Sequence, residues 1–238
     1  MKRFYKDTAV DAGDGGFRVL LDGKPMRTPA KAVLVVPTEA LAEAIAVEWA
    51  GVPEKSEINA ALLPLTRLAA TGLDRVPGQR GRVADDTAKY AASDMLCYRA
   101  TTPASLVQQQ TETWQPLLDW AAERYGARLA VASGTTFVTQ PHAAMAALRT
   151  AVAAHGDLGL SALYNLTHIA GSVVIGLAIS ERHLPPDKAF LAAELDELYQ
   201  VERWGTDPIV TARHDGIRRD LDAGARFLAL LGDSRLKG

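Results

Sequence analysis

The hydrophobic pattern changes once along this chain, and that change restricts the fold more than any other feature. Up to Pro37, short runs of branched apolar residues at 17–21 and 33–36 alternate with turn signals of the kind found in β-hairpins. From Thr38 onward, apolar residues recur at the three- and four-residue spacing of helices. Strands followed by helices predict an α+β fold, in which a small N-terminal β-rich unit with a packed helix precedes a larger all-α helical bundle domain.

Glycine marks the expected turns of the N-terminal unit. Asp14-Gly15-Gly16 precedes the run 17–21, and Asp22-Gly23-Lys24-Pro25 follows it. Glycine supplies the positive φ angle that a tight hairpin turn needs. A further strand is expected from Arg3 to Thr8.

One helix is expected to pack on these strands. Thr38, directly after Pro37, is a good cap for the helix that follows, and Gly51 ends it. Its apolar residues recur at a spacing of four and therefore share one face: Leu41, Ile45 and Trp49.

The rest of the chain is predicted to be helical, which gives an N-terminal domain over 1–63 and a C-terminal domain over 64–238. Gly126 is placed to stop one of the helices, and Pro116 should kink that helix or start a new one. The expected helices cover 65–73, 83–92, 103–125, 142–154, 160–179, 186–204 and 208–231.

The stretch 158–179 is apolar and long enough to cross a bilayer. It contains Asn165, Thr167 and His168 and lacks basic flanks, so a buried helix is the better interpretation. We therefore expect no membrane insertion.

Composition excludes several classes of partner. The net charge is −2 and the pI about 6.2, whereas nucleic acids and anionic membranes attract strongly basic surfaces.

The single cysteine, Cys97, rules out an internal disulfide framework. The N-terminus turns polar at once and has no secretory signal, so a cytoplasmic protein is predicted.

Catalytic and metal-binding motifs are absent from the sequence. The one glycine cluster, 13–16, lacks the spacing of nucleotide-binding loops. The five histidines are isolated in sequence, and no pair has the i, i+4 spacing of a helical zinc site. We predict no catalytic residue, no metal and no cofactor.

The stretch 193–205 gathers acids and aromatics near one helix end. Glu197, Gln200 and Trp204 fall on one helical face, and Asp196 lies beside them. Aromatic anchors with polar neighbours are typical of protein-binding surfaces. A surface helix with Trp204 tucked into the core explains the same pattern equally well.

Short blocks in a shared order make the chain resemble a known family, the chaperones that bind the alpha subunit of F-type ATP synthase. In eukaryotes the family is called ATP synthase mitochondrial complex assembly factor 2. The blocks that carry the resemblance are 21–29, 36–42 with Glu48-Trp49, 64–68, 97–99, 114–126 and 195–205.

The resemblance implies a bacterial chaperone, not an enzyme, that binds free alpha subunit and shields its beta-facing interface until beta displaces it. It implies that Glu197 is functionally important and that Trp49, with Pro37 before its helix, is structural. A monomer is expected when free. The partner-binding residues are predicted to be Glu197, Asp196, Gln200, Trp204, Trp114 and Trp120. The alternative is a small-molecule enzyme acting in a cleft between the two domains.

Overall fold

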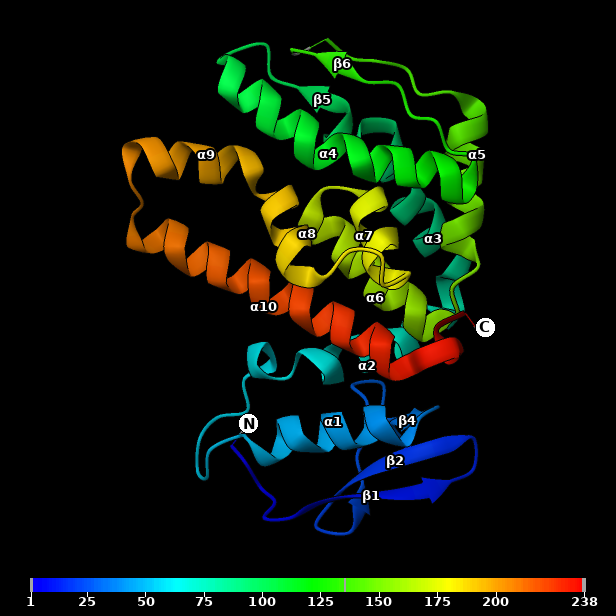
Figure 1. The fold of residues 1–238 in the computed structure, drawn as a ribbon. Helices are drawn as coiled ribbons and strands as arrows, with labels where there is room; N and C mark the ends of the chain where they lie inside the picture. The colour runs from blue at the N-terminus through cyan, green and yellow to red at the C-terminus, as the bar shows by residue number, and fades with distance from the viewer. Residues whose placement is uncertain (1, 135, 237–238) are drawn as a thin grey trace. The chain divides into compact units, whose positions relative to one another are not determined.

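The computed structural model describes residues 2–134 and 136–236 (Figure 1). The chain forms two compact units, each described separately below. The first comprises 1–80, 155–162 and 226–238, and the second comprises 81–154 and 163–225. Strands precede helices as predicted, so the α+β fold class is confirmed. The predicted domain boundary after residue 63 stays a prediction.

The first unit contains a small antiparallel sheet covered by a helix. Its elements are β1 (Thr8–Gly13), β2 (Gly16–Leu21), β3 (Lys24–Pro25), β4 (Val35–Val36), α1 (Glu39–Ala50), α2 (Pro64–Asp74), the start of α6 (Asp157–Ala170) and the end of α10 (Pro208–Leu231). The sheet order is β1-β2-β3, and β4 also pairs with β2. Helix α1 packs against β1 and β2 (Figure 1).

The β2–β3 turn follows the predicted chemistry. Asp22 and Gly23 both have positive φ, at 47° and 75°, which is the pattern of a type I′ turn. The expected strand from Arg3 to Thr8 is wrong, because the first strand starts at Thr8. The N–H groups of Lys6 and Asp7 instead donate to the Asp22 carboxylate, both at 2.9 Å.

Helix α1 begins as predicted. The Thr38 hydroxyl caps α1 by accepting the Leu41 N–H, and Pro37 precedes Thr38 at the surface.

Helix α1 in turn caps α2, the helix that follows it. The carboxylate of Glu48 accepts the N–H groups of Leu65 and Thr66, at 2.6 and 2.9 Å, in the first turn of α2. The sequence blocks around Glu48 and Leu65 therefore meet in the fold.

Trp49 lies at the same junction and is buried. Its indole N–H donates to the Thr66 hydroxyl at 3.0 Å, and its carbonyl accepts the Tyr5 hydroxyl at 2.7 Å. Both hydrogen bonds join segments far apart in sequence, which supports the predicted structural role of Trp49.

The second unit is helical apart from one short parallel strand pair. Its elements are α3 (Arg80–Ala88) from Gly81 on, β5 (Tyr98–Arg99), α4 (Ala104–Tyr125), β6 (Ala132–Ser133), α5 (His142–Ala153), the rest of α6, α7 (Val173–Ser180), α8 (Pro186–Ala193), α9 (Leu195–Trp204) and most of α10. Gly126 ends α4 in the left-handed conformation, as predicted, and α4 continues through Pro116.

Two predicted helices are broken, and each break has a local cause. The segment 160–179 divides between α6 and α7 because Gly171 has φ 63° and Ser172 caps α7, accepting the Ile175 N–H. Buried Asp94 accepts the Ser172 hydroxyl at 2.9 Å and holds that cap in place. The segment 186–204 divides between α8 and α9 at Glu194, whose φ of −103° and ψ of 14° are not helical.

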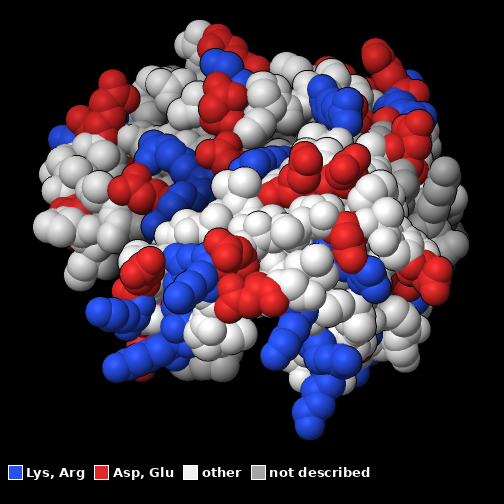
Figure 2. Space-filling model, turned by 90° about the horizontal axis from the view of Figure 1, so that it is seen from below, with Lys and Arg blue, Asp and Glu red and all other residues white. Residues whose placement is uncertain are grey.

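Among the described residues, no helix combines the length and the hydropathy needed to cross a bilayer. The apolar stretch that suggested a span forms α6 and α7 instead. Every residue of α7 is buried, whereas α6 also exposes Tyr164 and His168. On the face shown in Figure 2, Lys and Arg side chains are interspersed with Asp and Glu, in keeping with the net charge of −2.

Candidate functional site

The outer face of α9 carries three of the predicted partner-binding residues in one row. Asp196, Gln200 and Trp204 are spaced four residues apart and are all exposed. The opposite face is anchored by buried Leu195 and Tyr199. The row is therefore an accessible surface of the helix, and the alternative that places Trp204 in the core is wrong.

Two large apolar side chains are exposed where α9 turns into α10. Trp204 is 77% exposed and Ile209 is 81% exposed. The Asp207 carboxylate accepts the N–H groups of Ile209 and Val210, at 2.7 and 2.9 Å, which fixes the first turn of α10. The tip of this hairpin, residues 204–209, presents both side chains to solvent.

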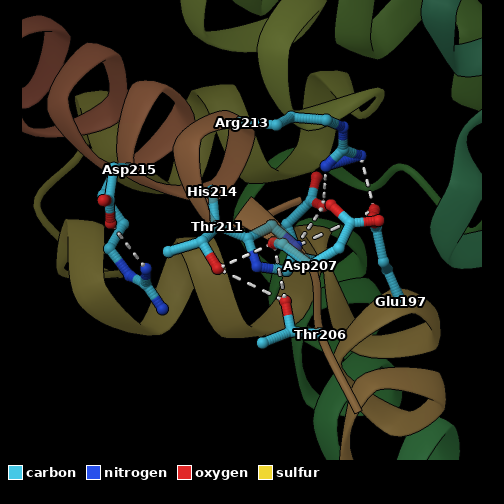
Figure 3. A network of polar contacts seen from close by, with 9 residues as sticks. Glu197, Thr206, Asp207, Thr211, Arg213, His214 and Asp215 are labelled. Carbon is cyan, nitrogen blue, oxygen red and sulfur yellow. Dashed lines mark hydrogen bonds and ion pairs between the residues drawn. The ribbon is translucent and has the colours of Figure 1, made fainter. Parts of the chain in front are cut away.

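Glu197 lies on the side of α9 that faces α10 and takes part in a charged cluster (Figure 3). Arg213 of α10 bridges two carboxylates, with Nη2 2.7 Å from Glu197 Oε2 and Nη1 2.5 Å from Glu194 Oε2. His214 directs Nε2 at the same two oxygens, at 3.5 Å from Glu194 and 3.8 Å from Glu197. We call Glu194, Glu197, Arg213 and His214 the hairpin cluster.

Burial divides the hairpin cluster into an inner and an outer half. Glu194 and His214 are buried, whereas Glu197 and Arg213 reach solvent. Desolvation raises the pKa of Glu194, and the nearby Arg213 guanidinium opposes that rise. The Arg213 bridge therefore compensates two neighbouring carboxylates that would otherwise repel each other.

The other two predicted anchors differ from Trp204. Trp114 is 1% exposed, and its indole N–H donates to the Ala192 carbonyl at 2.8 Å. A ring without free surface cannot serve as an anchor, so the structure contradicts a direct contact role for Trp114. Trp120 is half-buried and stacks on His183 with ring centroids 4.8 Å apart.

A cavity of about 840 Å³ in the second unit is the obvious place to look for an enzyme site. Its charged lining groups pair with one another. Arg149 lies 2.7 Å from Asp85, and Lys89 lies 2.7 Å from Asp86. These ion pairs account for most of the charged side chains of the lining, which also includes His142.

Comparison with known proteins decides the family. A family model described as the ATP12 chaperone protein matches residues 2–122, slightly more than half of the chain. The chain belongs to the ATP12 chaperone family. Among characterised relatives of the ATP12 family, the mitochondrial protein atp12 of Schizosaccharomyces pombe is 25% identical over 216 residues, which cover 86% of this chain and 74% of that protein.

Solved structures of ATP12 proteins agree over almost the whole fold. The crystal structure of Atp12 from Paracoccus denitrificans is 38% identical, covers 96% of this chain and 97% of its own, and has a TM-score of 0.89. An aspartate-to-lysine mutant of P. denitrificans Atp12p gives the same values. The Atu1473 protein of Agrobacterium tumefaciens is 38% identical, covers 97% of this chain and 86% of its own, and has a TM-score of 0.91.

These matches confirm the family predicted from the sequence, the assembly chaperones of ATP synthase, and the solved relatives are bacterial. Because ATP12 proteins are chaperones, the matches favour binding over the enzyme alternative. The individual partner-binding residues remain predictions.

Sequence reasoning missed Glu194, Ile209, Arg213 and His214. The i, i+3 spacing of Glu194 and Glu197 was a signal for a shared helical face. His214 looked isolated because it is brought to the two glutamates only when α10 packs beside the α8–α9 junction. Ile209 was visible as a large apolar residue directly after the turn 205–208.

Proposed function

We propose that this ATP12 protein binds the free alpha subunit of F-type ATP synthase. It covers the surface that alpha later presents to beta, prevents aggregation of that surface, and leaves when beta binds. Membership of the ATP12 chaperone family supports the class of function, and the resemblance stated from the sequence blocks supports alpha as the partner. Large uncovered apolar patches promote association, which is why such a partner needs a cover.

The exposure of Trp204 and Ile209 on one hairpin is the observation that carries the proposal. A tryptophan side chain that is largely exposed to water is unfavourable, and burial against a partner would remove that cost. Tryptophan is also enriched among the residues that dominate binding energy. Truncation of such an anchor costs about 2–4 kcal/mol, which is about 30- to 1000-fold in Kd.

Polar neighbours of the anchors suit reversible binding. Asp196 and Gln200 extend the exposed row of α9, and Asp196 is oriented by the Gln110 side chain at 2.7 Å. Polar rims contribute orientation and on-rate more than affinity. A partner held by a few apolar anchors within a polar rim can be displaced by a competitor with a larger interface.

The experiment uses purified alpha subunit and follows its aggregation by light scattering. Wild-type protein is expected to suppress aggregation and to form a one-to-one complex that dissociates when beta subunit is added. Trp204→Ala should weaken the complex by at least about 30-fold. Phe137→Ala is the matched control, because Phe137 is also a large exposed aromatic but lies outside the hairpin.

Glu197→Lys serves as a second, charge-reversing variant. It places a cation beside Arg213 and should separate the hairpin cluster as well as repel a basic partner. No binding of wild-type protein to free alpha at any salt concentration would overturn the proposal. Equal affinities for Trp204→Ala and Phe137→Ala would remove the hairpin from it.

A further inference from the structure

Three metal-ligating side chains converge at the hairpin cluster. Glu194, Glu197 and His214 each offer one ligand atom, and these atoms all lie within 4.8 Å of one another. Within the described part of the chain, this is the only group of three or more His, Cys, Asp or Glu side chains that could hold a metal ion. Glu194 directly precedes α9 and Glu197 lies in its first turn, and His214 faces both carboxylates.

A second observation concerns His214 alone. It is 5% exposed, and its Nε2 atom is buried and has no hydrogen-bond partner. A buried polar atom without a partner costs about 1–3 kcal/mol, so such atoms are rare and call for an explanation. The atom is directed at the two carboxylate oxygens but stays beyond hydrogen-bonding geometry, at 3.5 and 3.8 Å.

Those separations suit a shared ion better than a direct hydrogen bond. Zinc lies about 2.0–2.1 Å from imidazole nitrogen and about 2.0–2.2 Å from carboxylate oxygen, so two ligands at a tetrahedral ion are about 3.4 Å apart. The two His214–glutamate separations are close to that value. An N–H···O hydrogen bond would instead bring the atoms to about 2.9 Å.

We propose that Glu194, Glu197 and His214 form a binding site for a divalent transition-metal ion of the zinc type. This inference goes beyond the proposed function and does not depend on it. One imidazole nitrogen with two carboxylate oxygens is a donor set that zinc accepts, whereas magnesium and calcium prefer oxygen alone.

Arg213 is the competitor of the ion. Its guanidinium bonds to the same Oε2 atoms that His214 faces, so it competes with an ion for these two oxygens. The Arg213 side chain is about half exposed, at 48%, so it can move into solvent when the ion enters. Two carboxylates carry a charge of −2, which a divalent ion neutralises fully and a single guanidinium only by half. A sufficient concentration of the metal therefore favours replacement of Arg213 by the ion.

The site ties two elements of the second unit together. Glu194 stands at the α8–α9 junction, Glu197 in the first turn of α9, and His214 in α10. Metal binding would therefore stiffen the α9–α10 hairpin and release Arg213 at its surface.

The test titrates the metal-free full-length protein with Co²⁺, followed by its visible absorption, and with Zn²⁺, followed by calorimetry. Wild-type protein is expected to bind one equivalent with the absorption of four-coordinate Co²⁺. His214→Ala should lower the affinity by at least about tenfold, because loss of even an outer-shell partner costs 10- to 100-fold. Arg213→Ala should raise it by about tenfold or more.

The controls share the residue types. His142→Ala removes an exposed histidine on α5, and Arg203→Ala removes an exposed arginine on α9; neither should change the affinity. Because His214 is buried, Glu197→Gln provides an independent ligand variant at a solvent-reaching position, and circular dichroism checks the fold of both. Absence of saturable binding by wild-type protein, or an unchanged affinity in folded Glu197→Gln, would overturn the site.

Discussion

Removal of the Glu48 carboxylate should destabilise the protein by about 2–3 kcal/mol. Helix α2 begins at Pro64, and its own N-cap residue, Leu63, makes no side-chain cap. Glu48 supplies the missing acceptors, since Oε1 takes the Leu65 N–H and Oε2 takes both the N–H and the hydroxyl of Thr66. Loss of a cap costs about 0.5–2 kcal/mol, and each buried N–H left without a partner about 1–3 kcal/mol.

Partial exposure of Glu48 places the expected value toward the lower end of that sum, because water can reach some of the freed groups. Thermal unfolding of Glu48→Ala should occur about 4–12 °C below wild type, given about 2–4 °C per kcal/mol for a chain of this size. Burial raises the pKa of Glu48, so the measurement is made at about pH 8, where the carboxylate is ionised. Glu48→Gln should fall between the two proteins, since its amide keeps one acceptor oxygen.

Glu43 provides the matched control for this prediction. It is an exposed glutamate on the same helix, and Glu43→Ala should change the free energy of unfolding by no more than about 0.5 kcal/mol. Equal melting temperatures for Glu48→Ala and Glu43→Ala would refute the capping argument. A Glu48→Gln variant as stable as wild type would show that the second oxygen and the charge do not matter.

Three further predictions test packing, pH dependence and reactivity. A Cβ atom on Gly72 would lie 2.9 Å from the Leu158 Cα. Gly72→Ala should therefore lower the free energy of unfolding, measured in urea, by about 1–3 kcal/mol. Gly81 has open space around it, so the control Gly81→Ala should be neutral or stabilising. Burial raises the pKa of Asp94 from 3.8 to about 6, so the folded state binds its proton more tightly than the unfolded state. The free energy of unfolding should therefore fall by about 2 kcal/mol as pH rises from about 4 to about 7, and Asp94→Asn should lack this component; an identical pH profile would contradict it. Cys97 is buried with its pKa raised to about 12, so a thiol reagent should modify it only in urea; rapid reaction of the native protein would be inconsistent with this burial.

The features predicted correctly from the sequence depend on local chemistry. The Asp22-Gly23 turn and the Gly126 helix stop need only the conformations open to their own residues. The fold class follows from the order of the hydrophobic periods, which also requires no long-range information. The ATP12 resemblance rests on several blocks in series, so it did not depend on any single motif.

The features missed depend on partners distant in sequence. The break before α7 is stabilised by Asp94, which lies 78 residues before Ser172. Trp114 and Trp204 occupy similar helical patterns, yet one donates to a carbonyl in the core and the other projects into solvent. Periodicity assigns residues to faces of a helix, and only the packing of neighbouring helices decides which face is covered.

The discontinuous makeup of the first unit has a consequence for synthesis on the ribosome. Its sheet and first helices belong with residues 226–238, and the Thr38 hydroxyl donates to the carbonyl of Leu230, 192 positions later. Translation runs from the N-terminus, so the sheet and α1 emerge from the ribosome long before residues 226–238 are made, and their contacts stay incomplete until then. A nascent chain stalled before residue 226 would have an incomplete first unit. During that interval, this assembly chaperone would itself need a chaperone.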